Sequence, residues 1–264
     1  MSASGHPVRH LDYTEQARTY DYTRGASPAI VRAVAKHLGP PGGSVLDVAG
    51  GTGNYAQVLE ARGFRVVVVD ASIAMLRRSI PKLGSGRQVA GDAMALPFRD
   101  QAFDRATFVH GLHLISHPSR ALEELRRVVR DGPAIVIDPT SDNVALFVHE
   151  YFGIKASAAG RPSTEEVLAM LQAAGFGRVA HERVIYTDSV DGSLHALHTS
   201  ALHLAGPAYL RNTSFWMGLD DDTRRAGLAA LARDLRSGLL EERVRAHFEQ
   251  AAVRGHETVF AAWP

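Results

Sequence analysis

The stretch VLDVAGGTGN, residues 45–54, decides how the rest of the chain is interpreted. A run of apolar residues, interrupted by Asp47, ends in a turn with glycine at positions 50, 51 and 53. Glycine adopts positive φ without steric cost and lets a ligand approach the backbone closely. Alone, such a turn leaves open whether it binds a ligand or only reverses the chain.

Short apolar runs alternate with helical patterns along most of the chain. The runs predict strands at 44–49, 65–70, 87–90, 103–109, 133–138, 178–187 and 257–263. The spacing of apolar residues between them predicts helices at 53–62, 72–79, 118–130 and 165–176. Near-continuous β-branched runs are typical of a parallel sheet covered by helices on both faces. We therefore expect an α/β fold with a doubly wound, mostly parallel seven-stranded sheet.

Two further regions are expected to be helical. Residues 1–43 are predicted to form an N-terminal helical lid, in which Ser27 and Pro28 start a helix as N-cap and first residue. Residues 188–254 are predicted to form a helical cap inserted before the last strand, with an Ala/Leu-rich helix at 226–240 and Trp216 in its core. The core of the fold would then comprise residues 44–187 and 255–264.

Composition narrows the possible functions. Lys and Arg total 29 against 28 Asp and Glu, so the chain lacks the basic excess that is usual in nucleic-acid-binding domains. The absence of cysteine excludes disulfides and thiolate chemistry. No apolar stretch is long enough to span a membrane, and no signal segment is visible at the N-terminus. We expect a cytoplasmic monomer or homodimer that binds neither nucleic acid nor membrane.

Three acidic residues mark the ends of successive predicted strands. Asp47 lies just before the glycine turn, Asp70 ends the second strand, and Asp92 follows the third. Three acids repel a phosphate, but they suit a ligand with ribose hydroxyls, an ammonium group and a positive sulfur. S-adenosylmethionine is such a ligand. A nicotinamide-dependent oxidoreductase is the alternative, because GGTGNYA also fits G-x-G-x-x-A.

Five stretches in fixed order then point to a family. They are LDVAGGTGN, VVVVDASIAML, GDAMALPF, FDRATFVHGLHLISHP and ALEELRRVVRDGPAIVIDP, which together span about residues 44–139. In this order they resemble the class I S-adenosylmethionine-dependent methyltransferases, in particular the small-molecule, ubiquinone/menaquinone-methyltransferase-like ("type 11") branch. The resemblance implies a Rossmann-like methyltransferase fold, S-adenosylmethionine as cofactor and S-adenosylhomocysteine as product.

The resemblance also implies a cofactor site. The turn around Gly51 would face the methionine part of the donor, Asp70 the ribose, and Val109 with His110 the sulfonium. The TYDYTRG segment (19–25) would close over the donor, with Tyr20, Tyr22 and Arg24 as its contacts. The family's usual first glycine is Ala49 here. The complete expected set is Tyr20, Arg24, Asp47, Ala49, Gly50, Gly51, Asn54, Asp70, Ala71, Met75, Asp92, Ala93, Val109 and His110.

Histidine is the natural candidate for a catalytic base, because its pKa lies near neutrality. His113 and His110 lie in HGLHLISHP, beside the end of the fourth predicted strand. A structural role for His113 is an equally good interpretation. A second group, HALHTSALH (195–203), would need a third ligand from elsewhere to bind a metal, so we expect no metal site there.

These features predict a methyltransferase that acts on oxygen, nitrogen or carbon of a small organic molecule, with specialised metabolism as the expected setting. In-line displacement from a sulfonium depends mainly on positioning and on exclusion of water. Two alternatives stay open: a protein of the same fold that binds the cofactor without transferring methyl, as a pericyclase or regulator, and an RNA methyltransferase.

Overall fold

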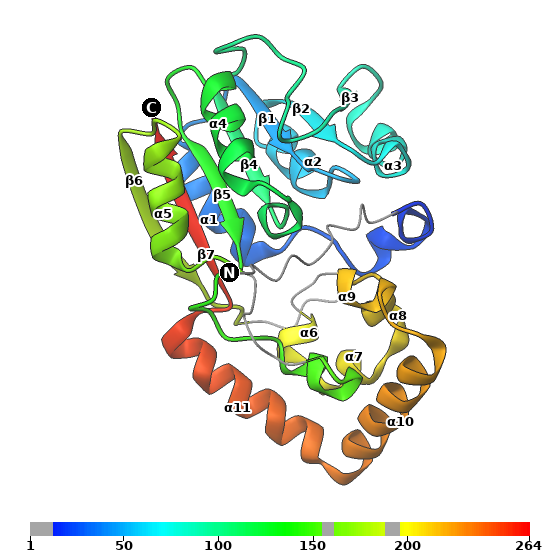
Figure 1. Cartoon of the computed structure of the whole chain (residues 1–264). Coiled ribbons are helices and arrows are strands. Elements are labelled where there is room, and N and C mark those ends of the chain that lie inside the picture. Colours follow the sequence, from blue (N-terminus) through cyan, green and yellow to red (C-terminus); the bar gives the residue numbers. More distant parts are fainter. Residues whose placement is uncertain (1–12, 155–160, 188–195) are drawn as a thin grey trace, which may run out of the picture.

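A seven-stranded sheet forms the centre of the computed structural model, which describes residues 13–154, 161–187 and 196–264 (Figure 1). The strand order is β3-β2-β1-β4-β5-β7-β6, and only β7 runs antiparallel to its neighbours. The strands are β1 (Ser44–Val48), β2 (Arg65–Asp70), β3 (Gln88–Ala90), β4 (Arg105–Val109), β5 (Ala134–Asp138), β6 (Arg178–Val184) and β7 (Glu257–Trp263).

Helices cover both faces of this sheet, as the alternation of strand and helix patterns predicts. They are α1 (Pro28–Leu38), α2 (Asn54–Ala61), α3 (Ile73–Leu83), α4 (Pro118–Val128) and α5 (Thr164–Ala173). Alternate residues of each strand point to opposite faces. On one face the sheet packs on α4 and α5 through residues such as Leu125 and Leu171. On the other it packs on α1, α2 and α3 through Ile30, Leu59 and Leu76. The doubly wound fold is therefore confirmed.

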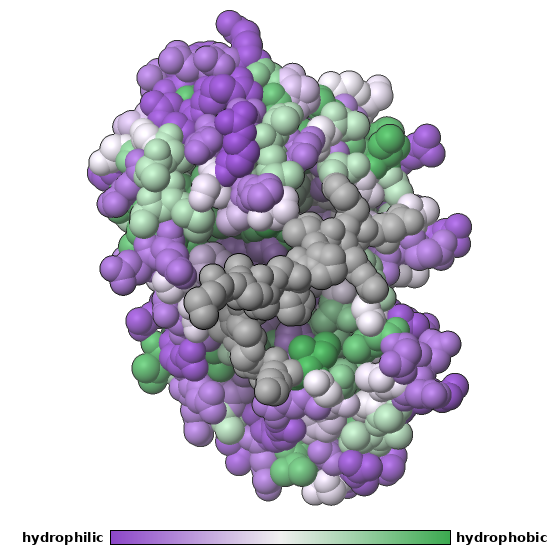
Figure 2. Space-filling model, in the orientation of Figure 1, coloured by the Kyte–Doolittle hydropathy of each residue, from purple (hydrophilic) through white to green (hydrophobic). Residues whose placement is uncertain are grey.

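A second group of helices lies between β6 and β7 in sequence, beyond the carboxyl ends of the parallel strands (Figure 1). They are α6 (Ala196–Thr199), α7 (Ala201–Ala205), α8 (Pro207–Arg211), α9 (Ser214–Met217), α10 (Asp221–Ser237) and α11 (Leu239–Arg254). They share a separate hydrophobic core with η4 (Phe147–Phe152), to which Trp216, Leu197 and Leu231 belong. Figure 2 shows hydrophobic side chains beside the hollow between this group and the sheet, on a face otherwise rich in hydrophilic ones.

The N-terminal segment is less helical than its pattern predicts. Before α1 it contains only two short 3₁₀ turns, η1 (Gln16–Arg18) and η2 (Tyr20–Tyr22). The Thr19 hydroxyl donates to Asn212 Oδ1, and the Thr23 hydroxyl accepts from Asn212 Nδ2, at the end of α8. These tertiary bonds hold residues with low helix propensity in a conformation that a continuous helix would not allow.

Other boundaries differ from prediction by a few residues. β6 ends at Val184 instead of 187, because the Tyr186 N–H donates to His256 Nδ1 and no longer to a neighbouring strand. α3 runs from Ile73 through Pro81 to Leu83, past the predicted end at 79, and α10 ends at Ser237 before Gly238.

Among the described residues, none of the helices combines the length and hydropathy that a membrane-spanning helix needs.

Candidate functional site

The glycine turn between β1 and α2 is shaped by the side chain of Asp47. A Cβ on residue 50 would lie 2.5 Å from Asp47 Oδ2, so only glycine fits there. Gly51 has a φ of 56° and Gly53, which precedes α2, a φ of 75°, in the region that favours glycine. Ala49 adopts a φ of 52° despite its Cβ, so the substitution of the family's usual glycine leaves local backbone strain at the end of β1.

This turn forms one wall of a cavity of about 680 Å³ at the carboxyl ends of the parallel strands. Ligands of open α/β sheets bind at this edge. Every residue of the expected site lines this cavity, including both candidate bases: Tyr20, Arg24, Asp47, Ala49, Gly50, Gly51, Asn54, Asp70, Ala71, Met75, Asp92, Ala93, Val109, His110 and His113. Tyr22 does not: 73% of its surface is exposed to solvent.

Asp70 is held by the backbone on both of its oxygens. Its Oδ2 accepts from the Gly51 N–H at 2.9 Å and its Oδ1 from the Ser72 N–H at 2.7 Å. Burial raises the pKa of Asp70 although these two bonds oppose the effect. The bond to Gly51 joins the end of β2 to the glycine turn, so the two parts expected to hold ribose and methionine are fixed relative to each other.

Two buried atoms of opposite charge border the cavity. Asp47 Oδ2 and Arg24 Nη1 have no hydrogen-bond partner within the described part of the chain. The other Asp47 oxygen accepts from Thr107 Oγ1 at 2.7 Å, and Arg24 Nε and Nη2 donate to the Asn212 carbonyl. An unpaired buried charge is costly, and a ligand with both an ammonium and a carboxylate would pair with the two. The amino-acid part of S-adenosylmethionine has these groups, so the residues fit this donor.

Two histidines at the end of β4 each pair with a buried carboxylate. His113 Nδ1 lies 2.7 Å from Asp138 Oδ1, at the end of β5. His110 Nε2 lies 2.7 Å from Glu257 Oε2, at the start of β7. Burial alone would lower the pKa of His110, but the charge of Glu257 and its hydrogen bond outweigh burial and raise the pKa.

A polar cluster that was not predicted lies beside the cavity, which only its member Thr52 lines. Lys82 Nζ donates to Asp21 Oδ1 at 2.8 Å and to the Thr52 carbonyl at 2.9 Å, and Asp21 Oδ1 also accepts from Thr52 Oγ1 at 2.6 Å. These residues join α3, the N-terminal segment and the glycine turn. Asp21 lies within TYDYTRG, but nothing in the sequence pairs it with Lys82, because the two are far apart along the chain.

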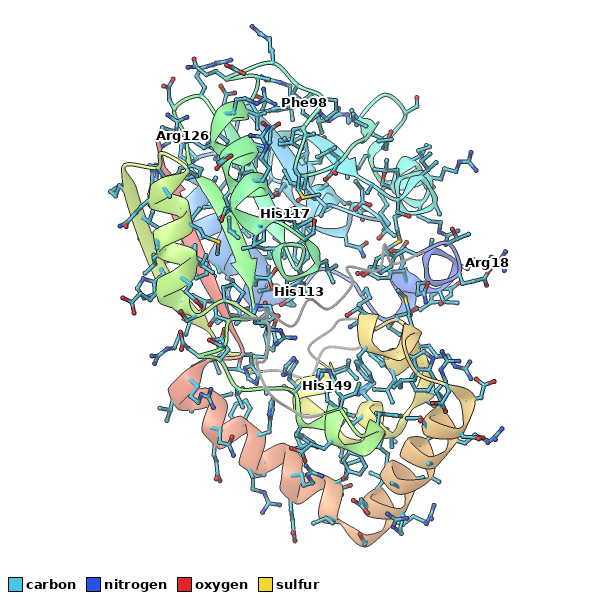
Figure 3. All side chains as sticks on the ribbon, viewed as in Figure 1. Arg18, Phe98, His113, His117, Arg126 and His149 are labelled. Atoms are coloured by element: carbon cyan, nitrogen blue, oxygen red, sulfur yellow. The ribbon has the colours of Figure 1, made fainter. Side chains whose placement is uncertain are left out.

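The opposite wall of the cavity comes from the residues just before η4, from η4 itself and from the helices between β6 and β7. Apolar residues Val144 and Leu146 line it together with Phe215 and His149, whose rings lie 4.6 Å apart. His113 and His149 face the intervening space from opposite sides (Figure 3). Burial, helped by the charge of Arg161, lowers the pKa of His149 to about 4, so this ring is neutral near neutral pH.

Three further histidines meet beside this wall. His198 of α6, His247 of α11 and His256 before β7 are all buried, and we refer to them as the three-histidine cluster. His198 is the only described histidine of the predicted pair at 195 and 198, since His195 lies outside the described residues. His203 is not part of the cluster, and its Nδ1 lies 2.7 Å from Ser200 Oγ.

Comparison with known proteins agrees with this fold. A family model for a methyltransferase domain matches residues 46–137. The chain is 37% identical to a demethylmenaquinone methyltransferase of Renibacterium salmoninarum, over 54% of this chain and 56% of that protein. It is 35% identical to a ubiquinone/menaquinone biosynthesis C-methyltransferase of Paracoccus denitrificans, over 56% of this chain and 72% of that protein. It thus spans about half the length of the first curated relatives it matches.

The fold has a counterpart among solved structures. A crystal structure described as a candidate methyltransferase from an antibiotic biosynthesis pathway of Anabaena variabilis superimposes with a TM-score of 0.75 at 22% identity, covering 90% of this chain and 98% of that one. The sheet order and its flanking helices are those of a Rossmann-like methyltransferase. Together with its sequence relatives, this means that the chain belongs to the class I S-adenosylmethionine-dependent methyltransferases, in the ubiquinone/menaquinone-methyltransferase-like branch.

Proposed function

We propose that this protein transfers the methyl group of S-adenosylmethionine to a small organic acceptor, at oxygen, nitrogen or carbon, in specialised metabolism. One observation carries the proposal. The unpartnered atoms of Asp47 and Arg24, which match the ammonium and carboxylate of the donor, border the same cavity as the His113–Asp138 pair. Donor site and candidate base therefore share one enclosed space.

A hydroxylated aromatic ring of the quinol type is the acceptor that we propose. The named relatives are methyltransferases of demethylmenaquinone and of ubiquinone/menaquinone biosynthesis. A quinone in its reduced, quinol form has ring hydroxyls. The wall opposite the donor site is apolar and aromatic, with Val144, Leu146 and Phe215, which favours burial of a ring. Ring hydroxyls would meet the polar side of the cavity around His113.

When bound, S-adenosylmethionine supplies an electrophilic methyl group on a positively charged sulfur. The residues of this chain would bind and orient it: Asp47 would accept from the ammonium, Arg24 would donate to the carboxylate, and Asp70 would accept from the ribose hydroxyls. Placing the acceptor atom in line with the methyl group and excluding water would account for most of the rate.

His113 is the better of the two candidate bases. Its Nδ1 faces Asp138, which favours the neutral tautomer with the proton on Nδ1 and a lone pair on Nε2. That lone pair can take the proton of an acceptor hydroxyl. His110 is less suitable, because Glu257 occupies its Nε2 at 2.7 Å and raises its pKa against the effect of burial. We therefore assign His110 to positioning and His113 to proton removal.

The first experiment measures donor binding and methyl transfer in the same preparation. We expect micromolar binding of S-adenosylmethionine and S-adenosylhomocysteine by calorimetry, and loss of both in Asp70→Ala. Incubation with methyl-labelled donor and a panel of naphthols, quinols and anilines should then give a labelled product. Donor binding without label in any acceptor would favour a cofactor-binding protein that transfers no methyl. Tight, strongly salt-dependent tRNA binding with labelled RNA would favour the RNA methyltransferase.

The role of His113 is tested separately. We expect His113→Gln to lower kcat on a phenolic acceptor by about 10²–10⁴, the usual contribution of a general base, with the donor dissociation constant unchanged. His117→Gln is the matched control, because His117 lies in the same stretch but does not line the cavity. Unchanged turnover in His113→Gln would reject the base role and leave His113 as a structural residue bonded to Asp138.

A further inference from the structure

The three-histidine cluster is assembled from parts of the chain that are distant in sequence. His198 comes from α6, His247 from α11 and His256 from the residue before β7. Their exposed fractions are 7%, 4% and 1%. One ring nitrogen from each lies within 4.8 Å of the others, and His198 Nδ1 is 3.1 Å from His247 Nε2. Three separate elements thus bring three imidazoles to one point.

This spacing is close to that of a metal-bound set. Zinc binds histidine nitrogen at about 2.0–2.1 Å, which in a tetrahedron puts the nitrogens about 3.4 Å apart. The pair of His198 and His247 already has this separation. His256 completes the set with a side-chain movement of about an ångström, given the 4.8 Å limit on the whole group.

Metal binding must displace hydrogen bonds that these rings make. His198 Nδ1 and His247 Nε2 lie at hydrogen-bond distance, and the Tyr186 N–H donates to His256 Nδ1 at 3.0 Å. The second bond places the proton of the neutral His256 ring on Nε2, so this proton must leave or move to Nδ1 before Nε2 can bind an ion. Each hydrogen bond contributes only about 0.5–1.5 kcal/mol, whereas structural zinc sites bind with roughly 10–16 kcal/mol, so the metal should displace these bonds when it is present.

We propose that His198, His247 and His256 bind one divalent transition-metal ion, with zinc as the reference ion, in the wall of the cavity. A set of imidazoles without a carboxylate suits zinc, cobalt, nickel or iron and not magnesium or calcium, which prefer oxygen ligands. Three protein ligands leave a fourth position open, as in catalytic zinc sites. His198 and His256 both line the cavity, so we place the open position on the cavity side.

A metal ion bound by the three-histidine cluster would assist the methyl transfer proposed above. This catalytic role rests on the proposed function. An acceptor hydroxyl that takes the fourth position would lose its proton more easily, because a bound divalent ion lowers the pKa of its ligand. The ion and His113 would then act on the same acceptor from different walls. The existence of the metal site does not depend on methyl transfer.

Metal binding is tested with full-length protein free of any polyhistidine tag and stripped of metal by a chelator. Calorimetric titration with Zn²⁺ should show one site per chain with a submicromolar dissociation constant. His198→Gln, His247→Gln and His256→Gln should each weaken binding by at least about 100-fold. His203→Gln is the matched control, since His203 lies on the neighbouring α7 outside the cluster, and it should bind as the wild type does.

Further measurements keep the test independent of folding defects. Circular dichroism and thermal unfolding without metal identify any variant that fails to fold, and X-ray absorption at the zinc edge of the wild type should then report three imidazole ligands. Replacement by Co²⁺ should give a visible spectrum that changes on addition of azide through the open position. Absence of stoichiometric binding, or equal affinity in all four variants, would overturn the metal site. A spectrum insensitive to azide would overturn the open position.

Discussion

The carboxylate of Asp47 is buried, and its Oδ2 has no hydrogen-bond partner among the described residues. Asp47 is 2% exposed, and only Thr107 bonds it among the described residues. Burial, reinforced by the charge of Asp70, raises its pKa to about 7 although the bond from Thr107 opposes this. Between about pH 4 and 7 the folded state therefore holds a proton that the unfolded state has released. The free energy of unfolding must fall as pH rises through this window.

Replacement of Asp47 by Asn should therefore stabilise the unliganded protein at alkaline pH. We expect the gain in free energy of unfolding over the wild type to be larger at pH 8 than at pH 5, by on the order of 2 kcal/mol. The same variant should bind S-adenosylmethionine more weakly, because the ammonium loses its anionic partner. Urea unfolding at both pH values and calorimetry measure the two effects.

Asp104→Asn is the control, because it should change the free energy of unfolding in the opposite direction. Its pKa is held below the ordinary value, mainly by the Ser44 N–H that donates to it, so its loss should destabilise the protein at neutral pH. A gain for Asp47→Asn that is the same at pH 5 and pH 8 would contradict the raised pKa of Asp47.

At the scale of elements, the N-terminal segment is joined to the glycine turn through α3. Lys82 near the end of α3 holds Asp21 of η2 and the Thr52 carbonyl. Burial lowers the pKa of Lys82, while burial of Asp21 is outweighed by the bonds from Lys82 and Thr52, which lower its pKa. The donor-side residues Tyr20 and Arg24 flank Asp21, so we infer that this cluster keeps the segment over the cavity.

Lys82→Met should release the N-terminal segment. We expect the dissociation constant of S-adenosylmethionine to rise roughly 10-fold, the effect of losing one charge-assisted bond. Cleavage by trypsin within residues 13–26 should become faster, and deletion of residues 1–25 should weaken donor binding further. Lys36→Met is the matched control, since Lys36 pairs with Glu182 on the surface. An unchanged dissociation constant in both Lys82→Met and the deletion would reject the lid.

At the scale of the whole molecule, one residue connects the helices between β6 and β7 to the donor side. Asn212, at the end of α8, accepts from the guanidinium of Arg24 through its carbonyl, at 3.2 and 3.0 Å. Its amide also donates to the Thr19 carbonyl and to Thr23 Oγ1. Asn212 is 4% exposed and lines the cavity. The wall that we assign to the acceptor therefore helps to orient the cation that we assign to the donor.

Asn212→Ala should lower the affinity for S-adenosylmethionine and the stability together. Loss of its buried side-chain bonds to Thr19 and Thr23 should lower the free energy of unfolding by about 1–3 kcal/mol. The backbone carbonyl that accepts from Arg24 is kept, so donor binding should weaken about 10-fold only because the segment that carries Arg24 is held less firmly. Asp220→Ala is the control, because it removes the N-cap of α10 without touching the N-terminal segment. Equal loss of donor affinity in both variants would contradict a specific role of Asn212. It would mean that general loosening of these helices lowers the affinity for S-adenosylmethionine.

The sequence by itself determined the parts of this protein that depend on local chemistry. β-branched runs, glycines and caps report strands, turns and helix starts directly, so all seven strands and the N-cap at Ser27 could be predicted. The order of motifs also located the cavity-lining acids, because in a parallel sheet the carboxyl ends of all strands meet at one edge.

Tertiary structure alone decided which distant side chains meet. The partners Asp138 of His113 and Glu257 of His110 lie 25 and 147 residues away in sequence, and no periodicity encodes such pairs. The same holds for the three-histidine cluster, whose members come from three elements of different orientation. Propensity and pattern act within a few residues of the chain, whereas these contacts are fixed by how helices pack between β6 and β7 and against the sheet.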